Sequence, residues 1–222
     1  MFGLTAAAGA ATVGYDPSLG SLPEAQGWGY HQDGAPVAVP AVVSGVLQQG
    51  PTDFSGHQYW DMANTHFDFT AGTVTVDARL HILASTFNAQ PRGGYGIFLI
   101  DDMGRIAGLH ISGGSVFLTN DSLTGASSIV SFDSTDAFHD YRMTAGPTGI
   151  ALSIDGNAIV SAGFGAPDSP GAQIFFGDAT ILGSNTSELA ALTVQGVTVP
   201  EPVGLGVLGL LCAGLARRVR RG

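Results

Sequence analysis

The chain has 222 residues, of which 45% are hydrophobic and 12% charged, with one cysteine and a formal net charge of −10. All eight basic residues are arginines, and the four that precede residue 203 stand against all 18 acidic residues, so residues 1–202 carry a formal net charge of −14. A strongly acidic surface repels nucleic acid, so no nucleic-acid partner is expected. Because the one cysteine is Cys212, residues 15–198 have neither a disulfide scaffold nor a zinc–thiolate site.

The N-terminal segment, residues 1–14, is similar to the end of a secretory signal peptide. Small residues around Ala8-Gly9-Ala10 suit an A-x-A cleavage site. The segment lacks a basic region and a full apolar stretch, so the alternative is a disordered leader rich in alanine and glycine. We predict that residues 1–14 are one or the other.

Residues 15–198 are expected to form one domain that is almost entirely β. Residues 73–82 alternate strictly, with apolar side chains on one face and Asp77, Arg79 and His81 on the other. Asp155-Gly156-Asn157 predicts a tight hairpin turn. No amphipathic helix is expected before Val203. Further strands are predicted at residues 95–100, 105–111, 115–119, 128–132, 138–144, 149–154, 158–162, 173–176 and 189–199.

Short motifs in this region resemble the concanavalin A-like and laminin G-like jelly-roll family. They are Leu22-Pro-Glu-Ala-Gln-Gly-Trp28, Phe138-His-Asp-Tyr-Arg-Met-Thr144, Ile154-Asp-Gly156 and Phe176-Gly-Asp178. The resemblance implies an all-β fold: a two-sheet antiparallel jelly-roll sandwich over residues 15–198. This agrees with the short alternating strands, which by themselves favour a sandwich.

The same resemblance allows the catalytic motifs of jelly-roll enzymes to be compared with this sequence. Jelly-roll glycosidases resemble one another in a Glu-x-Asp-x-x-Glu strand, whereas this chain has only three glutamates, no two of them near each other. Alginate lyases of this fold use Arg, Gln, His and Tyr, for which the nearest parallel is Arg79 and His81 with Tyr141, without a Gln-x-His strand. The expectation is therefore a protein that is not an enzyme.

Four residues are candidates for glycan binding. Tyr59 and Trp60 stand among polar residues, a mixture typical of carbohydrate sites. Arg79 and His81 point to the polar side of one strand. The alternatives are core packing for the two aromatic residues and a solvated cross-strand cluster for the other two.

The sequence requires no cofactor, and calcium is a candidate because it prefers oxygen ligands on loops. The candidate ligands are Asp101 and Asp102 at a predicted hairpin tip, and Asp178. Aspartates at tight turns also cap backbone amides, which is the alternative explanation.

The C-terminal segment, residues 199–222, has three parts. Val199-Pro200-Glu201-Pro202 interrupts regular structure because proline lacks a backbone donor. Residues 203–216 are apolar and as a helix would rise about 21 Å, short of a bilayer core of about 30 Å. The end of the chain is basic through Arg217, Arg218, Arg220 and Arg221. A buried core helix is the alternative, but a core helix would not end in a terminal arginine cluster.

This arrangement resembles the PEP-CTERM sorting signal. The resemblance implies export through the inner membrane of a Gram-negative bacterium, a short C-terminal transmembrane helix with its arginines inside, and processing by exosortase. The protein would be anchored in the inner membrane before processing and would then reach the cell surface or extracellular matrix. The function expected from the sequence is therefore a non-catalytic surface or matrix protein that binds exopolysaccharide or has a structural role in a biofilm. The alternative is a polysaccharide lyase or glycoside hydrolase on the same fold.

Overall fold

The computed structural model describes most of the region expected to form the sandwich. The described residues are 11–34, 38–51, 56–63, 65–87, 94–120, 127–167, 171–178 and 183–197. Residues 1–10 of the predicted leader and the predicted sorting signal from Val199 onward lie outside these ranges, as does the expected membrane helix at 203–216. The leader prediction is wrong for residues 11–14, which belong to strand β1 (Ala11–Tyr15) and pair with β15 (Gly183–Val197). Within the described ranges, no helix has the length and apolar character needed to cross a membrane.

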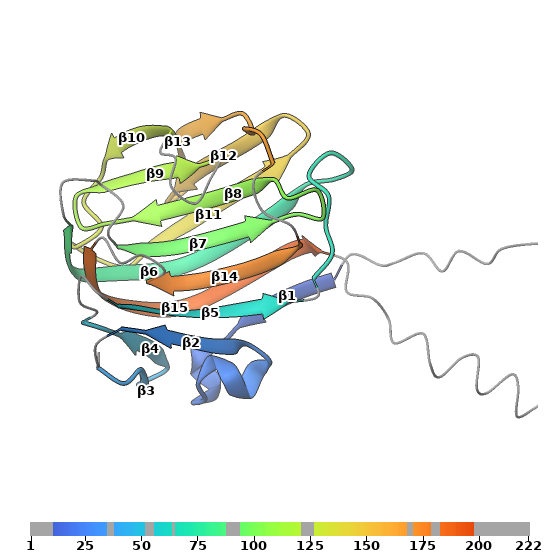
Figure 1. The fold of residues 1–222 in the computed structure, drawn as a ribbon. Helices are drawn as coiled ribbons and strands as arrows, with labels where there is room; N and C mark the ends of the chain where they lie inside the picture. Colours follow the sequence, from blue (N-terminus) through green and yellow to red (C-terminus); the bar gives the residue numbers. More distant parts are fainter. Residues whose placement is uncertain are drawn as a thin grey trace, which may run out of the picture.

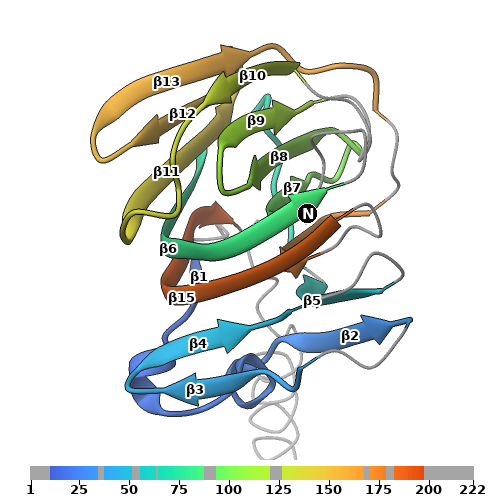
Figure 2. The same cartoon turned by 90° about the vertical axis from the view of Figure 1, so that its left-hand side faces the viewer.

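The strands form two antiparallel sheets, which confirms the predicted all-β sandwich (Figure 1). The eight-stranded sheet has the order β13 (Asn157–Ala162), β12 (Gly149–Ile154), β11 (His139–Gly146), β6 (Val74–Phe87), β15 (Gly183–Val197), β4 (Val46–Gln49) and β3 (Ala41–Val43), with β1 (Ala11–Tyr15) also paired to β15. The seven-stranded sheet has the order β10 (Ser127–Ser131), β9 (Ser115–Thr119), β8 (Ile106–Ile111), β7 (Tyr95–Ile100), β14 (Gln173–Asp178), β5 (His57–Ala63) and β2 (Gly29–Asp33). Figure 2 shows the sheets as two layers.

Two short 3-10 helices connect the first strands. They are η1 (Pro17–Leu19) and η2 (Pro23–Gln26), and each begins with a proline and ends at a glycine in the left-handed conformation. Proline at the first helical position and glycine at the end are the residues that such short turns favour. Neither is an amphipathic helix, because three or four residues are too few to form one apolar and one polar face.

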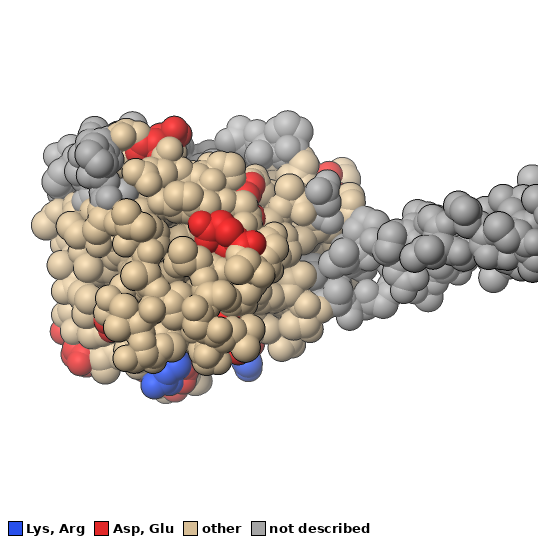
Figure 3. All heavy atoms as spheres, turned by 90° about the horizontal axis from the view of Figure 1, so that it is seen from below, with Lys and Arg blue, Asp and Glu red and all other residues tan. Residues whose placement is uncertain are grey.

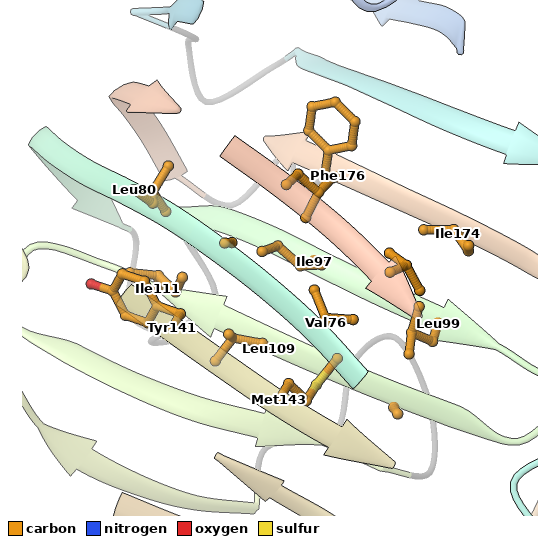
Figure 4. Close-up of a cluster of buried hydrophobic side chains, with 14 of the residues drawn as sticks. Val76, Leu80, Ile97, Leu99, Leu109, Ile111, Tyr141, Met143, Ile174 and Phe176 are labelled. Carbon is orange, nitrogen blue, oxygen red and sulfur yellow. The ribbon is translucent and has the colours of Figure 1, made fainter. Parts of the chain in front are cut away.

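The core lies between the sheets and is built from the inward-facing half of each alternating strand. In Figure 4, Val76, Leu80 and Met143 of the eight-stranded sheet meet Ile97 and Leu109 of the seven-stranded sheet. These side chains are at most 1% exposed. The alternation predicted for residues 73–82 is confirmed, because its apolar members face this core and Asp77, Arg79 and His81 face outward.

The predicted hairpin at Asp155 is also confirmed. Asp155 has φ 51° and Gly156 φ 79°, the left-handed values that a tight turn between β12 and β13 requires. Strands β7, β8 and β9 follow one another as the expected meander. The sequence did not predict the five strands before residue 64, because they are short and only partly alternating.

Candidate functional site

The two aromatic candidates for glycan binding point in opposite directions because they are adjacent on strand β5. Trp60 faces the core, is 0% exposed, and donates its indole N–H to Glu24 Oε2 at 3.2 Å. The prediction for Trp60 is therefore wrong, since no ligand reaches a ring buried between the sheets. Tyr59 faces outward from the seven-stranded sheet and is partly exposed.

Arg79 and His81 lie on the outer face of the other sheet. The Arg79 guanidinium donates to Asp140 Oδ1 at 3.0 Å, and His81 Nδ1 lies 3.7 Å from Glu188 Oε2. The four predicted residues therefore do not form one site, because the whole sandwich separates Tyr59 from the two residues of β6.

A polar cluster surrounds Tyr59 on three neighbouring strands of the seven-stranded sheet. His31 on β2 has its Nε2 2.9 Å from Asp61 Oδ1 on β5. Gln173 on β14 donates to the other carboxylate oxygen, Asp61 Oδ2, at 2.7 Å. The His31 ring also stacks on Tyr59, with centroids 4.9 Å apart and 15° between the planes. We call His31, Tyr59, Asp61 and Gln173 the His31 cluster.

Strand register brings the cluster together. His31 pairs with Tyr59 across the β2–β5 ladder, and Gly29 pairs with Asp61 two residues away. A Cβ at Gly29 would lie 2.6 Å from Asp61 Oδ1, so a side chain there would push the carboxylate away from His31. Glycine at position 29 therefore leaves the space in which the His31–Asp61 contact forms.

The surroundings of Tyr59 keep its phenol protonated. Burial and then the charges of Asp61 and Asp33 raise the pKa of Tyr59 above its ordinary value of 10. His57, whose Nε2 lies 3.0 Å from Asp33 Oδ2, also contacts the Tyr59 ring, with ring centroids 5.5 Å apart. Tyr59 is thus a neutral hydrogen-bond donor in contact with two histidines.

An aromatic row continues from Tyr59 across the same face of the sheet. Tyr59 contacts Phe175 at 5.9 Å, Phe175 stacks on Phe98 at 4.6 Å, and Phe98 meets the edge of His110 at 4.9 Å. His110 in turn stacks on Phe117 at 4.4 Å. Phe98, Phe175, His110 and Phe117 are all buried, whereas His31 has 45% of its side chain exposed. The His31 cluster is therefore the part of this row that solvent reaches.

Two of the three predicted calcium ligands are engaged with basic side chains of the protein. Asp101 is 0% exposed; its Oδ1 accepts from the backbone N–H groups of Met103 and Arg105 at 3.0 and 2.8 Å, and its Oδ2 accepts from Arg105 Nε at 2.8 Å. Asp102 Oδ1 lies 2.9 Å from His66 Nδ1. Asp178 is buried at the end of β14. Among the described residues, no group of three metal-ligating side chains could hold a metal ion, so the proposed calcium site is not supported.

The His31 cluster has the parts needed for proton transfer. A carboxylate only accepts hydrogen bonds, so Asp61 holds the proton of His31 on Nε2 and leaves Nδ1 as the basic nitrogen. Gln173 orients Asp61 by a hydrogen bond, and the neutral phenol of Tyr59 offers a hydrogen-bond donor on the same face. A base on β2, and its orienting carboxylate and a donor on β5, are thus supplied by two adjacent strands, with Gln173 on β14 as a third participant.

The sequence matches no protein-family model and no curated protein sequence. Solved structures with the same fold include a carbohydrate esterase from the Shiga toxin-encoding bacteriophage phi24B, with a TM-score of 0.57 and 16% identity, covering 85% of this chain and 99% of that one. A Bacillus subtilis protein with a galectin-like fold has a TM-score of 0.54 and 12% identity, covering 84% and 96%. The Crh5 transglycosylase has a TM-score of 0.50 and 12% identity, covering 85% of each chain. These likenesses show that the described part of the chain is a jelly-roll sandwich.

The comparisons also correct the prediction that the chain is not an enzyme. That prediction was based on the absence of the catalytic motifs of two jelly-roll enzyme families. A carbohydrate esterase and a transglycosylase have the same fold over 85% of this chain, so missing those two motifs does not make the fold non-catalytic.

Proposed function

We propose that this protein is a carbohydrate-active enzyme that hydrolyses ester substituents, such as acetyl groups, on a neutral polysaccharide. The observation that carries the proposal is the contact of 2.9 Å between His31 Nε2 and Asp61 Oδ1, on an exposed face beside Tyr59. A histidine held by a carboxylate is a general base, and a base next to a neutral donor suits acyl-ester hydrolysis.

The position of the carboxylates argues against glycosidic cleavage by two acids. Asp61 is the carboxylate of the cluster, and Asp33 lies beside it on β2, four residues from Gly29, the partner of Asp61. At about 3.3 Å per residue their backbone positions are about 13 Å apart. Each carboxylate also contacts a histidine, Asp61 with His31 at 2.9 Å and Asp33 with His57 at 3.0 Å. A two-carboxylate glycosidase instead needs both carboxyl groups to act on the scissile bond, one as acid and the other as nucleophile or base.

The charge of the protein argues against β-elimination from an acidic polysaccharide. The chain carries a formal net charge of −10, and the cluster contains Asp61 and has Asp33 beside it. Figure 3 shows one face of the molecule, on which Asp and Glu residues are scattered while Lys or Arg residues are visible only along one margin. A polyuronate would be repelled by the negative electrostatic potential of this surface, whereas a neutral polysaccharide would not.

In the proposed reaction, His31 Nδ1 accepts a proton from water while the water oxygen bonds to the ester carbonyl carbon. Tyr59 donates a hydrogen bond to the carbonyl oxygen as it becomes negative. The C–O bond to the sugar then breaks, and the imidazolium of His31 returns its proton to the sugar oxygen. The products are a carboxylic acid and the free sugar hydroxyl, and His31 is regenerated.

A substrate panel with three readouts tests the proposal. The protein is incubated with O-acetylated xylan, deacetylated xylan, an unsubstituted glucan and a polyuronate, and free acetate, new reducing ends and unsaturated sugars are measured. Acetate released only from the acetylated polymer supports the proposal. Reducing ends or unsaturated sugars without acetate would contradict it in favour of a glycosidase or a lyase, and no product from any polymer would also contradict it.

We further propose that the protein is exported and sorted by its tail, residues 199–222. The support is the order of the Pro-Glu-Pro motif, the apolar run at 203–216 and the four terminal arginines. Exosortase and the inner membrane would then be transient partners, and the enzyme would act on exopolysaccharide outside the cell. Expression in a host with and without exosortase tests this: the tail should be removed only where exosortase is present, and equal processing in both hosts would contradict the proposal.

A further inference from the structure

The outer face of the eight-stranded sheet has a hollow of about 400 Å³ on the side of the sandwich opposite the His31 cluster. Two ion pairs line it. Arg142 donates from Nε and Nη2 to the two carboxylate oxygens of Asp77, at 2.6 and 3.1 Å, and Arg79 donates from Nη1 to Asp140 Oδ1 at 3.0 Å. Each pair joins facing residues of β11 and β6.

The hollow exists because small residues stand next to long ones. On β15, Ala191 pairs with Arg79 and Thr193 pairs with Asp77, after a register shift between Leu189 and Ala191. Their short side chains leave the space beside the arginines unfilled, and Ser153 and Gly156 bound its other side. The floor of the hollow is therefore lined by small, partly apolar side chains, and its walls carry charged groups.

One of the two ion pairs retains unused hydrogen-bonding groups. In the described part of the chain, the Arg79 guanidinium makes a single hydrogen bond, and Asp140 Oδ2 makes none. Both side chains are open to solvent, at 52% and 64% exposed. Arg79 thus has further donors and Asp140 a further acceptor, all directed from one rim of the hollow.

An aromatic ring lies beside this rim. The ring of Phe138 is centred 5.8 Å from Arg79 Cζ and 5.3 Å from the His81 ring, and Phe138 is partly exposed. An apolar ring next to paired donors and acceptors is the combination that binds a sugar, whose C–H face packs on the ring while its hydroxyls exchange hydrogen bonds.

The charges decide which ligand fits. The charges of the two arginines and the two aspartates cancel, so the hollow attracts neither an anion nor a cation overall. A ligand with many hydroxyls can satisfy its hydrogen-bond donors and acceptors together. We propose that this hollow is a second saccharide-binding site, for a neutral glycan, on the face opposite the His31 cluster. The ligand class rests on the proposed function.

Two sites on opposite faces would change how the enzyme meets its substrate. A protein that holds one polysaccharide segment in the hollow raises the local concentration of the same polymer at its other face. The second site would therefore keep the enzyme on an insoluble or entangled matrix between turnovers.

The test is a calorimetric titration with a deacetylated xylo-oligosaccharide, which has no ester to hydrolyse. The wild-type protein should bind two oligosaccharides. The double variant Arg79→Gln/Asp140→Asn keeps the net charge and should bind one, with binding at the hollow weakened at least about tenfold because hydrogen bonds to charged groups are lost. Thr193→Gln fills the hollow without removing a charged group of either ion pair and should have the same effect, whereas Ser161→Gln on β13 is a matched control that should not.

The two proposals fail in different ways. If Arg79→Gln/Asp140→Asn and Thr193→Gln bind the oligosaccharide like the wild type, the second site is overturned even where acetate is released. If the wild-type protein binds no xylo-oligosaccharide, a neutral-glycan site at the hollow is also overturned. Loss of one binding event in both variants supports the second site even where no ester is hydrolysed.

Discussion

His31 lies flat against Tyr59, with ring centroids 4.9 Å apart, because the two residues are direct partners across the β2–β5 ladder. The same ladder places Asp61 opposite Gly29, so its carboxylate can reach His31 Nε2 at 2.9 Å. Antiparallel register therefore brings together a base, its carboxylate and a phenol that are up to 30 residues apart in sequence.

Replacing the orienting carboxylate should remove most of the proposed esterase activity. In Asp61→Asn, the amide no longer fixes the proton on His31 Nε2, and we expect acetate release to fall by about 10² to 10⁴. The matched control is Asp102→Asn, which breaks the His66–Asp102 contact of the same 2.9 Å elsewhere. Equal activity in the two variants would exclude Asp61 as the orienting group.

Removing the phenol should affect turnover more than binding. Tyr59→Phe keeps the ring contacts with His31, His57 and Phe175 but loses the hydrogen bond to the developing oxyanion. We expect kcat to fall by roughly 10² or more while KM changes little. Steady-state kinetics on O-acetylated xylan measure both constants, and an unchanged kcat would show that Tyr59 has no part in the reaction.

The ion pair at the β7–β8 turn should be a major source of stability. Asp101 is 0% and Arg105 12% exposed, and Arg105 also lies 5.9 Å from the Phe69 ring. In Arg105→Met, the buried carboxylate is left without its cation, so we expect the free energy of unfolding to fall by about 3 to 5 kcal/mol. Urea denaturation measures this, and the exposed pair supplies the control, since Arg142→Met should cost far less. Equal losses would contradict the role assigned to Arg105.

A glycine on the outer face of the seven-stranded sheet should resist enlargement. A Cβ at Gly108 would lie 2.6 Å from the Phe98 ring, which is buried in the aromatic row. Gly108→Ala forces the ring or strand to move, and we expect a loss of about 1 to 3 kcal/mol. In the control, Gly163→Ala, a Cβ meets no atom within 4 Å. Thermal unfolding of both variants measures the difference, and equal melting temperatures would show that the ring is not tightly packed.

One histidine should make stability depend on pH. His139 Nδ1 and Nε2 each lie 2.7 Å from a carboxylate, of Asp155 and Asp136 respectively. Burial alone would lower the pKa of His139, but the hydrogen bonds with Asp155 and Asp136 outweigh it and raise the pKa above 6.5. A raised pKa in the folded state stabilises the protein fully below pH 6.5, and this contribution is lost as pH rises through the folded-state pKa.

Urea unfolding across this pH range checks the sign. The wild-type free energy of unfolding should decline as pH rises above about 6.5, and that decline should be absent in His139→Gln. The control is His57→Gln, which replaces a histidine on the other sheet and should keep the wild-type decline. An identical pH profile for wild type and His139→Gln would contradict the assignment.

Much of the sandwich could be predicted because its signals are local. Strict alternation at residues 74–82 and the Asp155-Gly156 turn depend on neighbouring residues only. The His31 cluster has no such signal: Asp61 meets Gln173 across 112 residues, and that contact depends on the order of strands in the sheet. Trp60 was misassigned because a one-residue step along a strand reverses the face, and the sequence around β5 does not fix which face is inside.

The measurement that tests the proposed active site most directly is acetate release by His31→Ala, with and without added imidazole, beside His66→Ala. His66 has a similar exposure and a similar aspartate contact, so it controls for losing a surface His–Asp pair. We predict that His31→Ala is inactive, that imidazole restores part of its activity by replacing the missing base, and that His66→Ala equals the wild type. Full activity in His31→Ala would contradict the assignment of the active site to this face.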